Sequence, residues 1–183
     1  MIPDITQEIS TISAKTHKIT VQGAQIFAYE IGQGSPVLYL HGSPDTHDMW
    51  LPAIEHIGSD VRNIAIDLPG FGQSTMSDNF SLSLDNMADT IHELIMNLDI
   101  EEPVTLVTTD FGGHYGLAFT VKYPDMVRGV AISNTNFFAD YSGKARRQDA
   151  KDAEPGFSVF GTGEFMSYDN TDVDSFGIGG WAP

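Results

Sequence analysis

The sequence has no cysteine among its 183 residues, which excludes disulfide bonds and thiol chemistry. Cationic residues are also few: 9 Lys and Arg stand against 25 Asp and Glu, so the formal net charge is −16. That charge repels nucleic-acid phosphates and anionic membranes, and we expect neither as a partner. The sequence has no apolar run of the roughly 18 residues that a membrane helix needs. Its first stretch, MIPDITQEIS, lacks the features of a secretion signal, so we expect a cytoplasmic location.

The composition favours one globular domain followed by a tail. Hydrophobic residues make up 41% of the chain, which is enough for a single core. Residues 143–183 are rich in glycine and follow neither the helical nor the strand period. We therefore predict a structured domain over 1–142 and an irregular tail over 143–183.

Strands and helices alternate along the domain. Residues 18–31 form two alternating runs around Gln22-Gly23, which predicts a hairpin. Short continuous apolar runs predict buried strands, and helical spacing predicts helices between them. The strands are predicted at 35–40, 61–66, 104–109 and 128–133, and the helices at 46–57, 84–98 and 112–123. This alternation predicts an α/β fold with a mainly parallel sheet and flanking helices, whose functional groups lie at the carboxyl ends of the strands.

Three loops follow predicted strands: HGSP at 41–44, DLPG at 67–70 and TTDFGG at 108–113. In the third loop a buried strand ends on Asp110 and glycines follow at once. A nucleophile elbow needs such small neighbours, because its central residue stands on a sharp turn between strand and helix. The dipole of the following helix would keep Asp110 ionised and able to attack. The alternative is that Asp110 only caps the helix.

The order of these three loops resembles the N-terminal half of an α/β-hydrolase, from about residue 18 to 141. Most members have serine at the elbow, whereas an aspartate is similar to haloalkane dehalogenases and epoxide hydrolases. The resemblance implies that Asp110 attacks an sp³ carbon and forms an alkyl ester, which a histidine-activated water hydrolyses. It also implies an oxyanion hole made by the backbone N–H groups of Phe111 and Ser43. His41 and Phe111 would line the substrate site, with His41 mainly shaping its loop.

Two residues depart from the dehalogenase pattern. Ser43 stands where these enzymes usually have Asn, and Phe111 stands where they usually have Trp, so side-chain donors to a leaving halide are reduced. The loop that begins at His41 is closer to epoxide hydrolases, while Asn134-Thr135 is similar to some dehalogenases. Epoxides and haloalkanes therefore both remain candidate small-molecule substrates. We expect no cofactor and no metal, since the 170–174 motif lacks the glycine and glutamate of a calcium loop.

The remaining triad members are missing from the family positions. In this fold the acid and then the histidine follow the nucleophile, but all six histidines (17, 41, 47, 56, 92 and 114) lie at or before residue 114. His114 is expected to pack or face solvent. Asn134 stands where some dehalogenases have the acid, so the acid would be expected beyond it, where the tail offers Asp169, Asp172 and Asp174 but no histidine.

We therefore expect an α/β-hydrolase sheet that is truncated before the last strands and carries no recognisable cap. Such a sheet would leave the strand at 128–133 as an edge through which the chain could associate with itself or a second chain. The main hypothesis is a hydrolase acting through Asp110. The alternative is a catalytically incomplete fragment, pseudoenzyme or binding protein. In a split enzyme, a second polypeptide would supply the acid and histidine.

Overall fold

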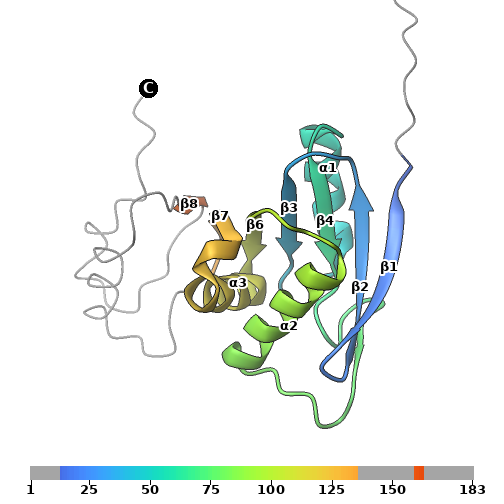
Figure 1. The fold of residues 1–183 in the computed structure, drawn as a ribbon, viewed down its shortest axis with the longest axis vertical. Coiled ribbons are helices and arrows are strands. Elements are labelled where there is room, and N and C mark those ends of the chain that lie inside the picture. The colour runs from blue at the N-terminus through green and yellow to red at the C-terminus, as the bar shows by residue number, and fades with distance from the viewer. Residues whose placement is uncertain (1–12, 136–158, 163–183) are drawn as a thin grey trace, which may run out of the picture.

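The structure, a computed structural model, describes residues 13–135 and the backbone of 159–162 (Figure 1). Its strands are β1 Lys15–Val21, β2 Ala24–Ile31, β3 Pro36–Leu40, β4 Arg62–Ile66, β5 Thr75–Met76, β6 Val104–Thr109, β7 Val127–Ser133 and β8 Val159–Thr162. Its helices are α1 Leu51–Ile57, α2 Leu84–Asn97 and α3 Asp110–Lys122, with short 3-10 helices η1 His47–Trp50 and η2 Pro124–Met126.

The strands form one mixed sheet in the order β1-β2-β4-β3-β6-β7-β8, and β5 pairs with β2. The pairs β1–β2 and β2–β4 are antiparallel, whereas β4, β3, β6, β7 and β8 run parallel to one another. This confirms the predicted mainly parallel α/β sheet. The parallel part brings the carboxyl ends of β4, β3 and β6 to the same edge.

The first hairpin forms as predicted, because its turn has residues that tolerate positive φ. Gln22 has φ 49° and Gly23 has φ 88°, the signs that a two-residue type I′ turn requires. Val21 pairs with Ala24 across this turn. The hairpin extends the sheet beyond β4 and covers that flank of the parallel strands.

Helices cover both faces of the sheet. The larger core lies between the sheet and α2 with α3: Leu38, Leu40 and Leu106 of the strands pack in the same cluster as Ile91 and Phe119. The smaller core lies under α1, where Ile54 packs with Tyr39 and Ala65. In Figure 1, α2 and α3 lie on the near side of the sheet and α1 on the far side.

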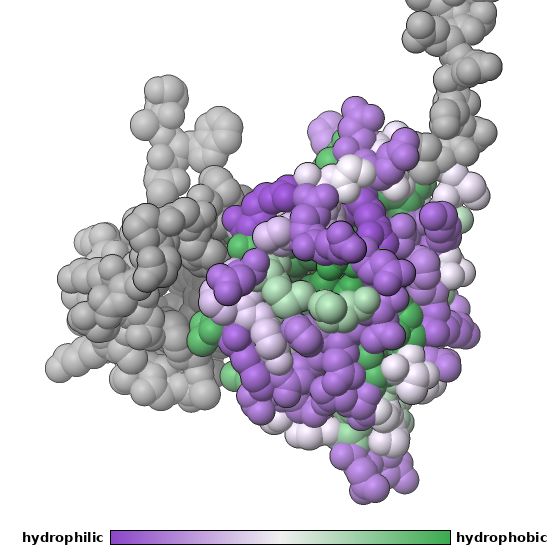
Figure 2. All heavy atoms as spheres, in the orientation of Figure 1, coloured by the Kyte–Doolittle hydropathy of each residue, from purple (hydrophilic) through white to green (hydrophobic). Residues whose placement is uncertain are grey.

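Helix α2 has the caps and pattern that its sequence predicts. The hydroxyl of Ser83 accepts the N–H of Asn86, which satisfies one of the free donors at the helix start. The apolar stripe of α2 is buried against the sheet, while its other face is polar. Figure 2 shows this side of the molecule, which is largely hydrophilic with a smaller apolar area near the centre.

Several boundaries differ from the predictions. The helix predicted at 46–57 is divided into η1 and α1, since Pro52 occupies the first turn of α1 and suits a helix start. Helix α3 begins at Asp110, two residues earlier than predicted. The other predicted strands are found within one residue of their expected limits, apart from the earlier start of β1 at Lys15.

The prediction that β7 forms an open edge is wrong. Val130 to Ser133 of β7 pair in parallel with Val159 to Thr162 of β8, so the backbone groups of β7 are satisfied from within the chain. Most of the predicted irregular tail, 143–183, lies outside the described residues, and β8 is its described part.

Candidate active site

Three loops meet at the carboxyl edge of the parallel strands. Leu40 at the end of β3 is paired with Ile66 at the end of β4 and with Thr108 near the end of β6. The chain therefore leaves these strands at one level, and the loops that begin at His41, Asp67 and Asp110 are neighbours. This is the arrangement that the sequence predicts for the site.

Asp110 stands on a sharp turn from β6 into α3. Its φ is 48°, in the left-handed region that residues with a side chain rarely occupy. It is solvent-exposed and is the first residue of α3, whose N-cap is Thr109. The alternative in which Asp110 caps the helix is therefore wrong. Its carboxylate instead bonds to another loop: the backbone N–H of Ser43 donates to Asp110 Oδ1 at 3.0 Å.

The turn is possible because glycines surround it. A Cβ atom on Gly112 would lie 2.3 Å from the carbonyl oxygen of Leu40, and one on Gly42 would lie 2.3 Å from the Cβ of Asp110. Both distances are far below contact distance, so neither position accepts a side chain without movement of the backbone. The two glycines let the β3 loop and the start of α3 approach closely enough for Ser43 to reach Asp110.

Thr135 ties the end of β7 to the same turn. Its hydroxyl donates to the backbone oxygen of Asp110 at 2.6 Å. A Cβ atom on Gly113 would lie 2.6 Å from the Thr135 side chain, so the two residues are in close contact. Asn134, just before Thr135, has φ 48° and turns the chain toward Asp110. The spacing of the sequence gives no signal for this hydrogen bond.

Phe111 forms an aromatic surface beside Asp110. Its side chain is 46% exposed, and its ring stacks on Tyr115 with centroids 6.5 Å apart. The ring of His114 meets it edge-on at 5.9 Å. Phe111 is the second residue of α3, so helix geometry provides no intrahelical acceptor for its backbone N–H. The expected oxyanion and substrate-binding roles of Phe111 stay predictions.

His41 is fully buried and both of its ring nitrogens are engaged. The N–H of Leu68 donates to His41 Nε2 at 2.9 Å, so the ring proton lies on Nδ1, which donates to the Gly42 oxygen at 2.6 Å. Burial lowers the pKa of His41 and outweighs the opposite effects of the Gly42 carbonyl and Asp67. These contacts account for His41 as a loop-forming residue, whereas its substrate-binding role stays a prediction.

Asp67 and His47 form a pair that sequence reasoning missed. His47 Nδ1 donates to Asp67 Oδ1 at 2.8 Å, and the His47 backbone N–H donates to the same oxygen at 2.7 Å. Asp67 Oδ2 accepts the N–H of Gln73 at 2.8 Å, and Ser74 Oγ donates to the Asp67 backbone oxygen at 2.7 Å. These bonds fix the backbone of the loop that follows β4. The sequence shows no sign that His47 joins them.

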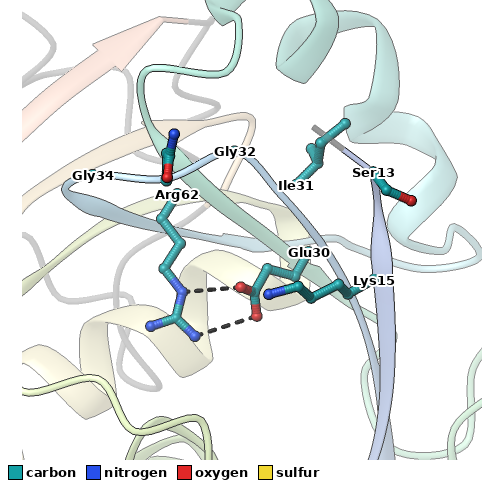
Figure 3. Close-up of a pocket in the computed structure, with 8 residues that line it drawn as sticks. Ser13, Lys15, Glu30, Ile31, Gly32, Gly34 and Arg62 are labelled. Atoms are coloured by element: carbon teal, nitrogen blue, oxygen red, sulfur yellow. Dashed lines mark hydrogen bonds and ion pairs between the residues drawn. The ribbon is translucent and has the colours of Figure 1, made fainter. Parts of the chain in front are cut away.

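Two open pockets lie at the opposite edge of the sheet, away from Asp110. One, of about 270 Å³, is lined by residues at the end of β2 and the start of β4 (Figure 3). In it, Arg62 makes two hydrogen bonds of 3.2 Å to the buried carboxylate of Glu30. The second, of about 470 Å³, shares Gly34 and Arg62 with the first. The Arg62 charge in these pockets is already paired with Glu30, and this edge of the sheet therefore differs from the site at Asp110.

Three other features of the chain concern metal ligands, membrane-length helices and the remaining candidate acids. Within residues 13–135, no three His, Asp or Glu side chains are grouped to hold a metal ion. None of the helices in the described ranges has the length and apolar character that crossing a bilayer requires. Asp169, Asp172 and Asp174, the carboxylates considered as a triad acid, lie outside the described residues.

Comparison with known proteins identifies the fold. Residues 35–170 match the family described as the alpha/beta hydrolase fold. The chain belongs to the α/β-hydrolase family. This confirms the resemblance that the three loops indicate, and it agrees with the strand order and the loops of the structure.

Relatives of this α/β-hydrolase include proteins with both predicted activities. A haloalkane dehalogenase of Agrobacterium fabrum is 34% identical over 119 residues, which are 65% of this chain and 38% of that protein. The structure of a haloalkane dehalogenase from Agrobacterium tumefaciens C58 has a TM-score of 0.62 and 32% identity, covering 78% of this chain and 50% of that one. The Cif epoxide hydrolase of Acinetobacter nosocomialis has a TM-score of 0.62 and 26% identity, covering 66% and 38%. The chain thus spans half or less of the length of each.

Proposed function

We propose that this α/β-hydrolase uses Asp110 as a nucleophile on small haloalkanes or epoxides and forms an alkyl ester with them. The observation that supports this most strongly is the carboxylate itself, which is exposed on a left-handed turn and held through Oδ1 by the Ser43 N–H at 3.0 Å. With Oδ1 held by this hydrogen bond, Oδ2 would be the oxygen that attacks the substrate carbon. The two relatives named haloalkane dehalogenase and the one named epoxide hydrolase supply the substrate classes.

In the first step, Asp110 Oδ2 forms a bond to an sp³ carbon of the substrate. In a haloalkane the carbon–halogen bond breaks, and halide leaves with the electron pair. In an epoxide a ring carbon–oxygen bond breaks, and the oxygen stays on the substrate and takes a proton from water. A carboxylate suits this displacement because it attacks without first losing a proton at neutral pH.

In the second step, water adds to the carbonyl carbon of the ester and the bond from that carbon to Oδ2 breaks as the alcohol leaves with Oδ2: one proton of the water goes to the alcohol, the other goes to solvent, and the Asp110 carboxylate is restored. Oδ1 becomes an oxyanion as water adds, and the Ser43 N–H already points at it. The N–H of Phe111 would be the second donor. Both are backbone groups, so the proposed hole does not depend on the side chain at either position.

The second step is expected to be slow in this chain. Water needs a general base, and the His41 ring is buried with both nitrogens hydrogen-bonded. His47 is bonded to Asp67, and no histidine follows residue 114 in the sequence. We therefore expect the ester to accumulate instead of turning over rapidly.

A burst experiment tests this proposal. The chain is mixed with bromoalkanes and, separately, with epoxides, and released bromide or consumed epoxide is measured against protein concentration. We expect one equivalent per chain in a burst, followed by slow turnover. Asp110→Asn should abolish the burst, whereas Asp78→Asn, which changes an exposed carboxylate outside the three loops of the site, should preserve it. If neither substrate class gives a burst, the alternative of a non-catalytic binding protein is favoured instead.

A further inference from the structure

The conformation of the loop that carries Ser43 determines where the Ser43 N–H lies relative to Asp110. This loop runs from His41 to His47, and each end is anchored by a histidine. His41 Nε2 accepts the N–H of Leu68 at 2.9 Å, and His47 donates twice to Asp67 Oδ1. Both anchors therefore end on consecutive residues after β4. The position of the Ser43 N–H follows from how firmly these two anchors hold.

Asp67 is built to hold the second anchor rigidly. Its side chain is fully buried, and N–H groups of His47 and Gln73 reach both of its oxygens. A Cβ atom on Gly72 would lie 2.2 Å from Oδ2, so the 72–73 backbone is wrapped closely around the carboxylate. A carboxylate in such a place cannot rotate to another partner without leaving several donors unsatisfied.

A buried carboxylate is a costly way to fix a loop, because an ion loses hydration on burial. Hydrogen bonds to a carboxylate are shorter and stronger than those to a neutral amide, so the residues that donate to it are held more firmly in position. The imidazole of His47 is itself buried and is packed against Phe27 at 4.8 Å and Tyr29 at 6.0 Å. Strand β2 therefore holds His47 through ring packing, and the 72–73 backbone holds Asp67.

The same packing excludes His47 as the base for Asp110. Its ring contacts belong to β2, and in the sheet β2 is separated from β6 by β4 and β3. Nδ1 is taken by Asp67, and Nε2 lies 3.4 Å from the Asp48 carboxylate. Any effect of the pair on the reaction must pass through the loop.

We propose that His47 and Asp67 are positioning residues, which hold the 41–47 loop so that the Ser43 N–H meets Asp110 Oδ1. The inference rests on the proposed function for its catalytic meaning, but the placement of the Ser43 N–H is measurable without any reaction. His47 serves as a donor to Asp67 and not as an acid or base.

The test compares His47→Leu with His47→Asn in the full chain. Leucine keeps an apolar contact with Phe27 and Tyr29 but loses the donor, whereas the asparagine amide can place an N–H near the position of Nδ1. Hydrogen exchange of the Ser43 amide is measured by NMR, with the Leu94 amide in the core of α2 as the reference. Bromide release from 1-bromobutane is measured in parallel.

In His47→Leu we expect exchange of the Ser43 amide to rise about tenfold and the bromide burst to slow by a similar factor, the loss of one charge-assisted hydrogen bond. The Leu94 amide should be unchanged, and His47→Asn should resemble the natural chain. If His47→Leu does not fold, Asp67→Asn serves instead. The asparagine NH2 group would replace one carboxylate oxygen and would face an N–H donor of His47 or Gln73, so this variant should give the same selective effect.

Three results would overturn the inference: Ser43 exchange unchanged in His47→Leu, Leu94 exchange raised by the same factor, or His47→Asn behaving like His47→Leu. The two proposals fail separately. Selective loss of Ser43 protection, with no burst from the natural chain on either a bromoalkane or an epoxide, would reject the proposed function and retain the positioning pair. Unchanged Ser43 exchange together with a normal burst in His47→Leu would reject the positioning pair and retain the function.

Discussion

At the scale of single residues, the site depends on the absence of a side chain at Gly42. A Cβ atom there would lie 2.3 Å from the Cβ of Asp110, closer than any real contact. Either the β3 loop or Asp110 must move to make room. The distance between the Ser43 N–H and Asp110 Oδ1 would change with that movement.

Gly42→Ala should therefore abolish the covalent burst and lower the free energy of unfolding by about 1–3 kcal/mol, the usual cost of forcing an extra group into a packed place. Gly58→Ala is the matched control. Gly58 has φ 87° but has no atom within 4 Å of a hypothetical Cβ, so it should lower stability through backbone strain alone and leave the burst intact. The burst and the free energy of unfolding in urea are measured for both variants. Bursts of equal size in Gly42→Ala and Gly58→Ala would contradict this account of the turn.

His41 contributes stability that depends on pH. Burial lowers its pKa in the folded protein below the ordinary imidazole value near 6.5. As pH falls from about 6.5, the unfolded chain binds a proton before the folded chain does, so the stabilisation by neutral His41 is lost over this window and is complete above it.

Between about pH 6.5 and 5, the unfolding free energy of the natural chain falls as pH falls, and His41→Asn should make this slope less steep. The decrease in slope should be at most about 1.4 kcal/mol per pH unit, the value for one proton bound by the unfolded chain and not by the folded chain. The variant will also be less stable at pH 7, so only the slope is compared. Urea unfolding at several pH values measures it, and an unchanged slope in His41→Asn would show that His41 is not the titrating group.

At the scale of elements, the β7–β8 pair decides whether the sheet has an open apolar edge. Ile132 and Val130 of β7 are buried in the main core, and its backbone pairs with β8 on the side away from β6. Without β8, the unpaired N–H and C=O groups of β7 would be available to a second copy of the chain.

Phe160→Pro should therefore promote self-association, because proline removes a donor and cannot continue the ladder. Sedimentation velocity over a range of concentrations should show dimers or larger species for this variant. Asp172→Pro, outside β8, should sediment like the natural chain. Identical sedimentation of Phe160→Pro and the natural chain would mean that the β7 edge does not control association.

At the scale of the whole molecule, the sequence predicts the sheet better than it predicts the site. Strand β3 is almost wholly buried, and β6 is buried on one face and half-buried along much of the other. Apolar and β-branched runs of this kind indicate parallel strands, and here the indication is correct. Gln22-Gly23 likewise specifies its turn through positive φ. These features are local, and local physics is visible in a sequence.

The contacts that shape the site are not local, and for that reason they are missed. Thr135 bonds to Asp110 across 25 positions, and His47 bonds to Asp67 across 20. The β7–β8 pair joins strands that are further apart still, and nothing in the glycine-rich sequence around it predicts a partner. Asp110 could be selected because the strand, the turn and the glycines beside it are contiguous.

The central claim is that Asp110 Oδ2 becomes bonded to substrate carbon, and mapping the modified residue tests it most directly. The chain is reacted with a bromoalkane and with an epoxide, digested, and the peptides are sequenced by tandem mass spectrometry. The account predicts one added alkyl or hydroxyalkyl group, located on Asp110 and absent from Asp110→Asn. A modification on another carboxylate such as Asp45, or bromide release with Asp110 unmodified throughout, would contradict it.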